Sequence, residues 1–107
     1  MTLLQIDFPH PGPFGNELTA ACTGLAQSIA AESGMLWKIW TENKQAGEAG
    51  GIYLFTDEAS ARKYLAMHEA RLAGMGIKNI RAKVFDVNET LSRMTNAPLF
   101  AVKTAAQ

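Results

Sequence analysis

One histidine of this chain occupies a position where an imidazole could take part in chemistry. His68 lies in helical register with Leu65 and Leu72, so its ring should point from a helix toward the interior. A partly buried imidazole beside a cavity can act as a base that takes a proton from a phenol or an enol, and it can also ligate haem iron. The alternative is a structural histidine that only satisfies neighbouring groups. Arg71, one helical turn further on, could bind a carboxylate or stay solvated.

Charged and aromatic side chains of the expected strands form a second group of candidates. Asp7, Lys38 and Lys83 are predicted to lie on the sheet face away from the helices, where they could orient an anionic or quinone-like substrate. They could equally form ion pairs across a subunit interface, because buried charges need partners. Aromatic residues predicted on the same face could stack on a flat ligand or fill an interface: Trp40, Tyr53, Phe55 and Phe85.

Other reactive residue types give weaker indications. His10 lies in the loop "PHPGPFG", where it could border a pocket or simply be solvated. Cys22 has no cysteine partner and no metal-ligand companion at a suitable spacing, so it is interpreted as a small apolar filler of a helix. The sequence contains no phosphate-binding, dinucleotide-binding or nucleophile-elbow motif and no zinc-like cluster. We therefore expect neither a metal nor a bound cofactor.

The composition argues against several classes of function. The 107 residues carry 10 basic and 10 acidic side chains without a basic run, which argues against nucleic acid as a partner. No apolar run approaches the length of a membrane span, and the N-terminus reads as a strand rather than as a secretion signal. With a single cysteine, a reduced cytoplasmic setting is the simplest expectation.

The candidate residues must be positioned by a regular order of elements. Alternation of apolar residues predicts four strands, over residues 3–8, 35–42, 52–56 and 79–87. Helical spacing predicts two helices, one capped by Asn16 and one capped by Thr56 or Asp57. Strand, helix, strand, strand, helix, strand is the ferredoxin-like βαββαβ order, an α+β fold with a four-stranded antiparallel sheet and both helices on one face.

The chain is expected to form one domain over residues 1–96, followed by a tail over residues 97–107. The tail has an apolar run after its proline. It could pair with a sheet edge, lie across a partner subunit or fray, as termini often do.

The two tryptophans should point to opposite faces of one strand. We predict that Trp37 lies under the helices and that Trp40 lies on the other face, because side chains alternate along a strand. The third strand is apolar on both faces, and we place Ile52 inward and Tyr53 outward. The second face then carries more aromatic surface than a soluble monomer usually exposes. A second copy of the chain is the simplest cover, so we predict a homodimer.

Several long segments make the chain similar to a known family. They are "GPFG", "GMLWKIWTE", "EAGGIYLFTDEASARKYLAMHEARL" and "AKVFDVNETLS". They resemble the YdhR family of small proteins, described as monooxygenases, from about residue 3 to about residue 94. The resemblance implies a dimeric α+β barrel, in which two ferredoxin-like sheets face each other. The wider superfamily includes cofactor-independent oxygenases of polyketide and quinol substrates, haem-degrading enzymes and isomerases.

The leading hypothesis is a cofactor-independent monooxygenase that acts on a small aromatic or quinol-like substrate in a barrel pocket. His68 is assigned as its base and Tyr53 as an orienting catalytic partner. The residues assigned to substrate binding are Trp40, Lys38, Phe55, Asp7, Phe85 and Arg71. One alternative is a homodimer that binds a hydrophobic small molecule without turnover. Another is a haem-binding protein with His68 as the axial ligand.

Overall fold

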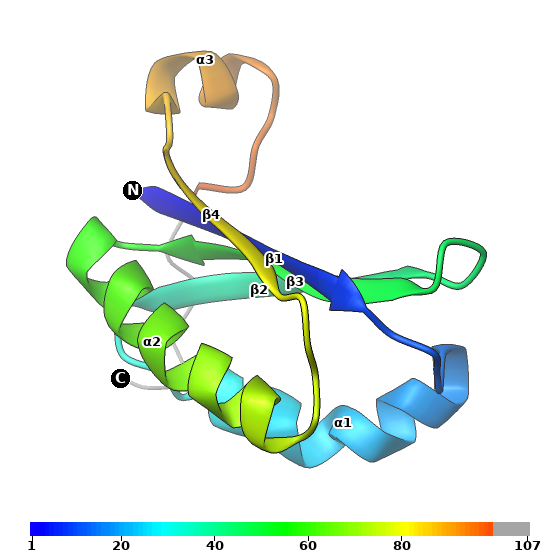
Figure 1. The fold of residues 1–107 in the computed structure, drawn as a ribbon. Coiled ribbons are helices and arrows are strands. Elements are labelled where there is room, and N and C mark those ends of the chain that lie inside the picture. The colour runs from blue at the N-terminus through cyan, green and yellow to red at the C-terminus, as the bar shows by residue number, and fades with distance from the viewer. Residues whose placement is uncertain (100–107) are drawn as a thin grey trace.

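The computed structural model describes residues 1–99. Four strands form one antiparallel sheet: β1 (Thr2–Pro9), β2 (Met35–Asn43), β3 (Glu48–Phe55) and β4 (Arg81–Asp86). Three helices accompany the sheet: α1 (Gly15–Ala30), α2 (Glu58–Gly74) and α3 (Glu89–Met94). The strand order is β2-β3-β1-β4, and α1 and α2 lie on the same side of the sheet (Figure 1). The predicted ferredoxin-like βαββαβ fold is confirmed.

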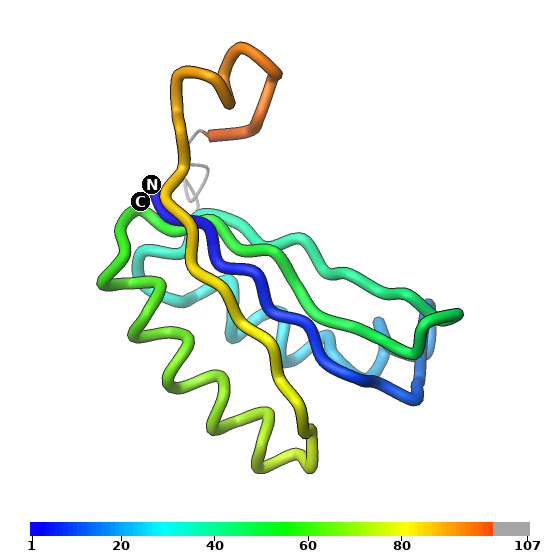
Figure 2. Tube along the Cα trace, turned by 45° about the horizontal axis from the view of Figure 1, so that its top comes forward, coloured from blue at the N-terminus to red at the C-terminus, as the bar shows by residue number. Residues whose placement is uncertain are grey.

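Strand β1 lies between β3 and β4 (Figure 2). Its alternating sequence buries Leu4 and Ile6 toward the helices and leaves Gln5 exposed. On β4, Val84 and Ala82 pair with Leu4 and Ile6 and pack against the same core. The side-chain orientation predicted for these two strands is therefore confirmed.

The ends of the helices follow local capping rules only in part. Asp57, one of the two predicted caps, accepts a hydrogen bond from the backbone N–H of Ser60 at 2.7 Å and caps α2. Helix α1 begins at Gly15 without a side-chain cap, rather than after the predicted cap Asn16. The short α3 was not expected, because six residues are too few for a periodic pattern. None of the helices in the described residues has the length and apolar character that a membrane crossing requires.

A bulge in β2 reverses the predicted orientation of most of its side chains. The register with β3 shifts between Met35 and Trp37, so Leu36 is an extra residue at this point. Beyond the bulge, Lys38 and Trp40 lie on the helix side of the sheet and Trp37 lies on the opposite side. The prediction that Trp37 points inward and that Lys38 and Trp40 point outward is wrong. A single inserted residue moves every later side chain of a strand to the other face.

The predicted orientation of β3 is also wrong. Tyr53 and Phe55 pair with Leu4 and Thr2, lie on the helix side and are fully buried. Ile52 lies on the opposite side. Because β3 is apolar on both faces, alternation within this strand does not indicate which face is buried.

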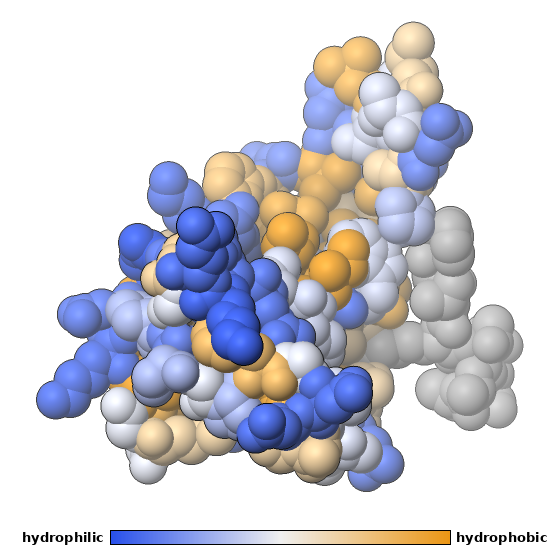
Figure 3. All heavy atoms as spheres, turned by 90° about the vertical axis from the view of Figure 1, so that its right-hand side faces the viewer, coloured by the Kyte–Doolittle hydropathy of each residue, from blue (hydrophilic) through white to orange (hydrophobic). Residues whose placement is uncertain are grey.

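The sheet face away from α1 and α2, called the outer face below, is partly covered by the end of the described chain. Leu99 packs against Leu36 of β2 and against β3. The indole Nε1 of Trp37 donates a hydrogen bond to the backbone carbonyl of Pro98 at 2.7 Å. In Figure 3, apolar residues gather at the level of the sheet below α3. The start of the predicted tail thus lies on its own sheet, and residues 100–107 lie outside the described residues.

Candidate functional site

A cavity of about 100 Å³ lies between the helix side of the sheet and the helices α1 and α2. Its wall is mostly apolar, with side chains from β1 and from both helices. Four of the residues predicted to belong to a site reach this wall: Lys38, Trp40, Tyr53 and His68. The structure therefore brings together candidates from β2, β3 and α2. They meet on the helix side of the sheet, whereas the sequence pattern had placed all but His68 on the outer face.

The side chain of Lys38 lies between two aromatic rings. Its Nζ atom lies 3.5 Å from the ring centroid of Trp40 and 4.7 Å from that of Tyr53. Gly51 pairs with Trp40 across the sheet, and a Cβ atom added to Gly51 would lie 2.4 Å from Cε of Lys38. Because Gly51 has no side chain, the aliphatic part of Lys38 can occupy this space, and Lys38 reaches the wall of the cavity.

Burial lowers the pKa of Lys38 from 10.5 to about 7, because the ammonium group loses its hydration in apolar surroundings. The neighbouring Cys22 raises this pKa, whereas the charge of Arg71 lowers it. The contact with the aromatic faces favours the ammonium by about 0.5–2 kcal/mol, which is less than the effect of burial. A large fraction of Lys38 is therefore a free amine at neutral pH and can accept a proton.

His68 lies on the inner face of α2 and is only 3% exposed. Two guanidinium nitrogens of Arg71, Nε and Nη2, lie 3.2 and 2.9 Å from its Nδ1 atom. A guanidinium group can only donate hydrogen bonds, so Nδ1 must accept and the neutral ring carries its proton on Nε2. Burial, and then the charges of Lys38 and Arg71, lower the pKa of His68 from 6.5 to about 4. At neutral pH the ring is a hydrogen-bond donor at Nε2.

Two tyrosines extend the cluster beside His68. Tyr64, one turn earlier on α2, stacks on the imidazole with ring centroids 5.0 Å apart. Its hydroxyl donates to the hydroxyl of Tyr53 at 3.4 Å, at the long end of hydrogen-bond distances. Burial raises the pKa of both phenols, so both stay protonated at neutral pH. Tyr64 was missed from the sequence, although its position four residues before His68 places it on the same helix face.

Four of the predicted binding residues do not reach the cavity. Arg71 contacts Nδ1 of His68 instead of the cavity wall. Phe55 is fully buried in the core and stacks on Tyr53 at 6.2 Å between centroids. Asp7 and Phe85 lie on the outer face. There the carboxylate of Asp7 pairs with the guanidinium group of Arg81 at 2.5 Å. The prediction that Asp7 and Lys38 share one face is therefore wrong, because the bulge in β2 turns the lysine away.

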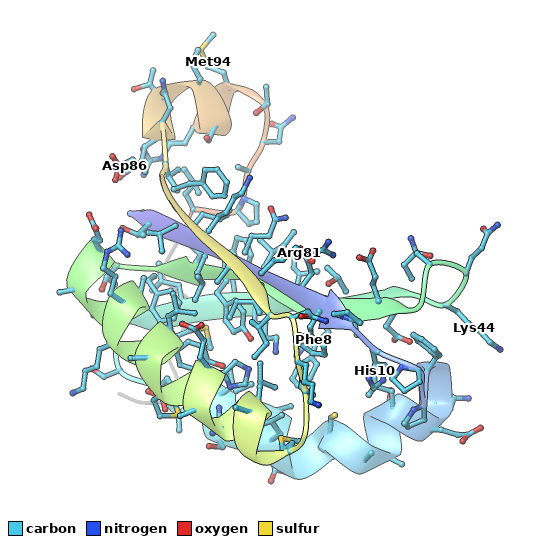
Figure 4. All side chains as sticks on the ribbon, in the orientation of Figure 1. Phe8, His10, Lys44, Arg81, Asp86 and Met94 are labelled. Atoms are coloured by element: carbon cyan, nitrogen blue, oxygen red, sulfur yellow. The ribbon has the colours of Figure 1, made fainter. Side chains whose placement is uncertain are left out.

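His10 and Phe8 border the end of the cavity next to α1, where β1 leaves the sheet (Figure 4). The Nε2 atom of His10 lies 2.8 Å from the carbonyl oxygen of Pro13, so it donates to this carbonyl. The ring also makes edge-to-face contacts with Phe8 and Phe14, with centroids 6.3 and 5.2 Å apart. His10 is thus held by its own loop and is not simply solvated.

A groove of about 530 Å³ runs between α1 and β2. It shares Leu18, Cys22 and Trp40 with the wall of the cavity, so the two spaces adjoin at these residues. Ligand sites usually measure about 300–1,000 Å³, which is more than the cavity alone provides. A ligand that places one ring in the cavity therefore has room for a larger body in the groove.

The surroundings of His68 do not suit a haem iron. Iron ligation through Nε2 requires this atom to be unprotonated, with the proton on Nδ1 directed at an acceptor. Here Nδ1 faces Arg71, which is a donor, and the cavity of about 100 Å³ is too small for a macrocycle. Among residues 1–99, no group of three or more His, Cys, Asp or Glu residues could hold a metal ion.

Solved structures with the same fold include oxygenases. The chain is similar to a "putative antibiotic biosynthesis monooxygenase" from Deinococcus radiodurans, with a TM-score of 0.61 and 13% identity, over 82% of this chain and 93% of that chain. It is similar to a variant of SnoaB, a cofactor-independent oxygenase from Streptomyces nogalater, with a TM-score of 0.58 and 18% identity, over 84% and 94% of the two chains. NE2512 from Nitrosomonas europaea, a protein of unknown function, has a TM-score of 0.57 and 18% identity, over 81% and 88%. At these identities the likeness establishes the fold alone.

Sequence comparison identifies the family directly. No curated protein matches the chain. A family model described as "Putative mono-oxygenase ydhR" matches residues 3–98, which covers the four strands except Thr2 and all described residues of the cavity wall. The matched range includes the four segments that resemble this family. The chain belongs to the YdhR family of monooxygenase-like proteins.

Proposed function

We propose that this protein is a cofactor-independent monooxygenase that oxygenates a small aromatic or quinol-like substrate in the cavity under its helices. The observation that carries the proposal is the position of Lys38 and His68 on one apolar wall. On this wall, a large fraction of Lys38 is an uncharged amine at neutral pH, and His68 offers an N–H donor at Nε2. The shared fold with SnoaB, a cofactor-independent oxygenase, supports the same reaction type.

The first step is a proton transfer. Lys38 takes the O–H proton of a bound hydroxyarene, which leaves an ammonium ion and an electron-rich oxyanion. The ammonium ion is favoured by the faces of Trp40 and Tyr53, which lie 3.5 and 4.7 Å away. Proton transfer thus creates an ion pair inside the cavity, in which the oxyanion offsets the free-energy cost of burying the charged Lys38.

The oxyanion then reacts with dioxygen. The conjugated ring carbon forms a C–O bond, and the substrate supplies the two electrons that break the O–O bond. One oxygen atom stays on the carbon as a carbonyl group, and the other leaves as water with the proton held by Lys38 and the hydrogen lost from the carbon. A hydroxyarene and dioxygen thereby give a quinone and water, so atoms and electrons balance without a further reductant.

His68 acts as a donor to the oxyanion in this proposal. The hydrogen bond from Arg71 keeps the imidazole proton on Nε2, which favours a donor role over the basic role assigned from the sequence. Tyr53 and Trp40 contact the ring, and the apolar wall keeps water from the anion. Removal of one such donor commonly lowers kcat by about 10²–10³.

Oxygen uptake tests the proposal. The protein is mixed with a panel of hydroxynaphthalenes and hydroxyanthracenes, with dioxygen followed by electrode and quinone by absorbance. Uptake that matches quinone formation is expected in the wild type, with a loss of about 10²–10⁴ in Lys38→Met. The matched control, Lys63→Met, removes an exposed lysine of α2 that does not line the cavity and should keep the wild-type rate. An unchanged rate in Lys38→Met, or no uptake with any member of the panel, contradicts the proposal.

We further propose that a second copy of the chain covers the rest of the outer face. Ile39 and Phe85 remain 53% and 43% exposed there, beyond the part on which Leu99 packs. Apolar side chains left uncovered on one sheet face are typical of an interface, and symmetric dimers are the commonest oligomers. Light scattering should give twice the mass of one chain, and Ile39→Asp should give a folded monomer. A single-chain mass for the wild type contradicts the dimer.

A further inference from the structure

Among the described residues, the charged side chains that line the cavity itself are of one sign, and no Asp or Glu is among them. Glu42 lies in the adjoining groove, where its carboxylate accepts from the backbone N–H of Gly15. Lys38 and His68 reach the wall, and Arg71 stands directly behind His68. Within residues 1–99, no ion pair links Lys38 or Arg71 to a carboxylate. The cavity therefore offers positive charge and hydrogen-bond donors without an internal anion to balance them.

A cation that has no anionic partner and lies next to apolar groups raises the free energy of the folded protein. A ligand that brings a negative oxygen removes this cost, because it supplies the missing partner and forms charge-assisted hydrogen bonds. A neutral ether or hydrocarbon of the same shape gains the apolar contacts only. The cavity should thus distinguish ligands by charge more strongly than by size.

The donors are also well placed to act together. Arg71 polarises the imidazole through Nδ1 and directs its N–H proton to Nε2, on the side away from the guanidinium group. The faces of Trp40 and Tyr53 contact Nζ of Lys38, and Cε of the same side chain lies over Gly51. Lys38 thus supplies a positive charge, and His68 supplies a hydrogen-bond donor of fixed orientation.

We infer that the cavity is a receptor for an aromatic oxyanion, so that its ligands are aromatic O–H acids rather than neutral arenes, ethers or amines. The identity of this class as the substrate rests on the proposed function, whereas the binding itself does not. The negative oxygen lies between Nζ of Lys38 and Nε2 of His68, with the ring against Trp40 and Tyr53. Phenolates and carboxylates share the required chemistry.

Three compounds of similar shape separate the possibilities. 4-Nitrophenol is yellow only when ionised, 4-nitroanisole is its neutral methyl ether, and 4-nitrobenzoate carries a carboxylate. The protein is titrated with each in a buffer acidic enough to keep free 4-nitrophenol neutral. The expected result is the yellow phenolate band in the complex and an affinity at least about tenfold above that of 4-nitroanisole. No yellow band together with equal binding of 4-nitroanisole and 4-nitrobenzoate overturns the inference.

The two anionic probes identify the source of the negative charge. Strong binding of 4-nitrobenzoate without a phenolate band assigns the site to carboxylates. A phenolate band with weak binding of 4-nitrobenzoate assigns it to phenols that ionise in place. In either case Lys38→Met should abolish the preference over 4-nitroanisole, while Lys63→Met, at an exposed position of α2 outside the cavity wall, should keep it. Retention of the preference in Lys38→Met contradicts the receptor.

A second variant covers the case in which Lys38→Met does not fold. His68→Phe replaces the imidazole with a ring of similar shape that has no N–H donor, and it should weaken binding of the preferred anion at least about tenfold. Unchanged anion binding in a folded His68→Phe protein contradicts the receptor. Binding of the phenolate without any oxygen uptake leaves the receptor intact and removes the monooxygenase proposal. Oxygen uptake with hydroxyarenes, together with equal affinities for 4-nitrophenol and 4-nitroanisole, removes the receptor and leaves the monooxygenase proposal intact.

Discussion

Arg71 and His68 lie one turn apart on α2, and the guanidinium group donates to Nδ1 of the imidazole from two nitrogens at 3.2 and 2.9 Å. This contact decides which ring nitrogen carries the proton. It also adds a positive charge beside a ring that is already buried, so protonation of His68 is suppressed. Arg71 is therefore a positioning residue, and its effect on the reaction must pass through His68.

Removal of the Arg71 charge should raise the pKa of His68. In Arg71→Gln the guanidinium charge is lost, so one of the causes that hold this pKa near 4 is gone. An NMR pH titration of the imidazole measures the change, and kcat should fall while KM changes little. The control Arg62→Gln removes an exposed arginine of the same helix that pairs with Glu58. An unaltered His68 titration in Arg71→Gln contradicts the assigned role.

The rate should rise with pH through the pKa of Lys38. A base must be unprotonated to act, so kcat/KM is expected to be low in acid and to increase with a midpoint near pH 7. Lys38→Arg keeps a positive charge but cannot lose its proton, so it should bind the oxyanion and lose turnover at every pH. Turnover by Lys38→Arg at the wild-type rate would exclude a basic role for this position.

Stability should also depend on pH through the two buried cationic groups. His68 has a pKa of about 4 in the folded chain and 6.5 when unfolded. Its contribution to the free energy of unfolding is therefore complete above pH 6.5 and is lost as the pH falls toward 4. Lys38 has a pKa of about 7 when folded and 10.5 when unfolded. Between these values the unfolded chain binds more protons, so the free energy of unfolding rises with pH.

Denaturant titrations over a pH series check this dependence. Lys38→Met should lose the rise between pH 7 and 10.5 and keep the fall below pH 6.5, because only the first belongs to the lysine. The same rise in both proteins would show that Lys38 is not responsible for it.

A methyl group at Gly51 should displace Lys38. The added Cβ of Gly51→Ala would lie 2.4 Å from Cε of Lys38 and 3.2 Å from Cε1 of Tyr53. We expect a cost of about 1–3 kcal/mol in the free energy of unfolding and a weaker preference for oxyanions. Gly24→Ala is the control, since this glycine lies in α1 with open space around it and should gain up to about 1 kcal/mol. Unchanged oxyanion binding by Gly51→Ala would contradict the path assigned to the lysine.

The fold and one site residue could be predicted from the sequence because their signals are periodic. Helical spacing placed His68 correctly in the interior, and alternation placed Leu4 and Ile6 of β1 and Val84 of β4 correctly in the core. These elements keep one period over their whole length, so a pattern of apolar residues is enough to orient them.

The rest of the site could not be oriented in this way. Alternation in β2 fails at Leu36, and this single extra residue moves Lys38 and Trp40 to the helix side. Tyr53 lies in a strand that is apolar on both faces, so its side is set by pairing with β1 rather than by its own neighbours. The contact between Arg71 and His68 depends on side-chain conformation, which spacing along a helix does not fix.

A crystal structure of the protein with 4-nitrophenol would show whether the phenolate binds beside Lys38. We expect the ring in the cavity under α1 and α2, with the phenolate oxygen within hydrogen-bond distance of Nζ of Lys38 and Nε2 of His68. A ligand bound on the outer face, near Asp7 and Phe85 or between the sheets of two subunits, with the cavity beside Lys38 left empty, would contradict this expectation.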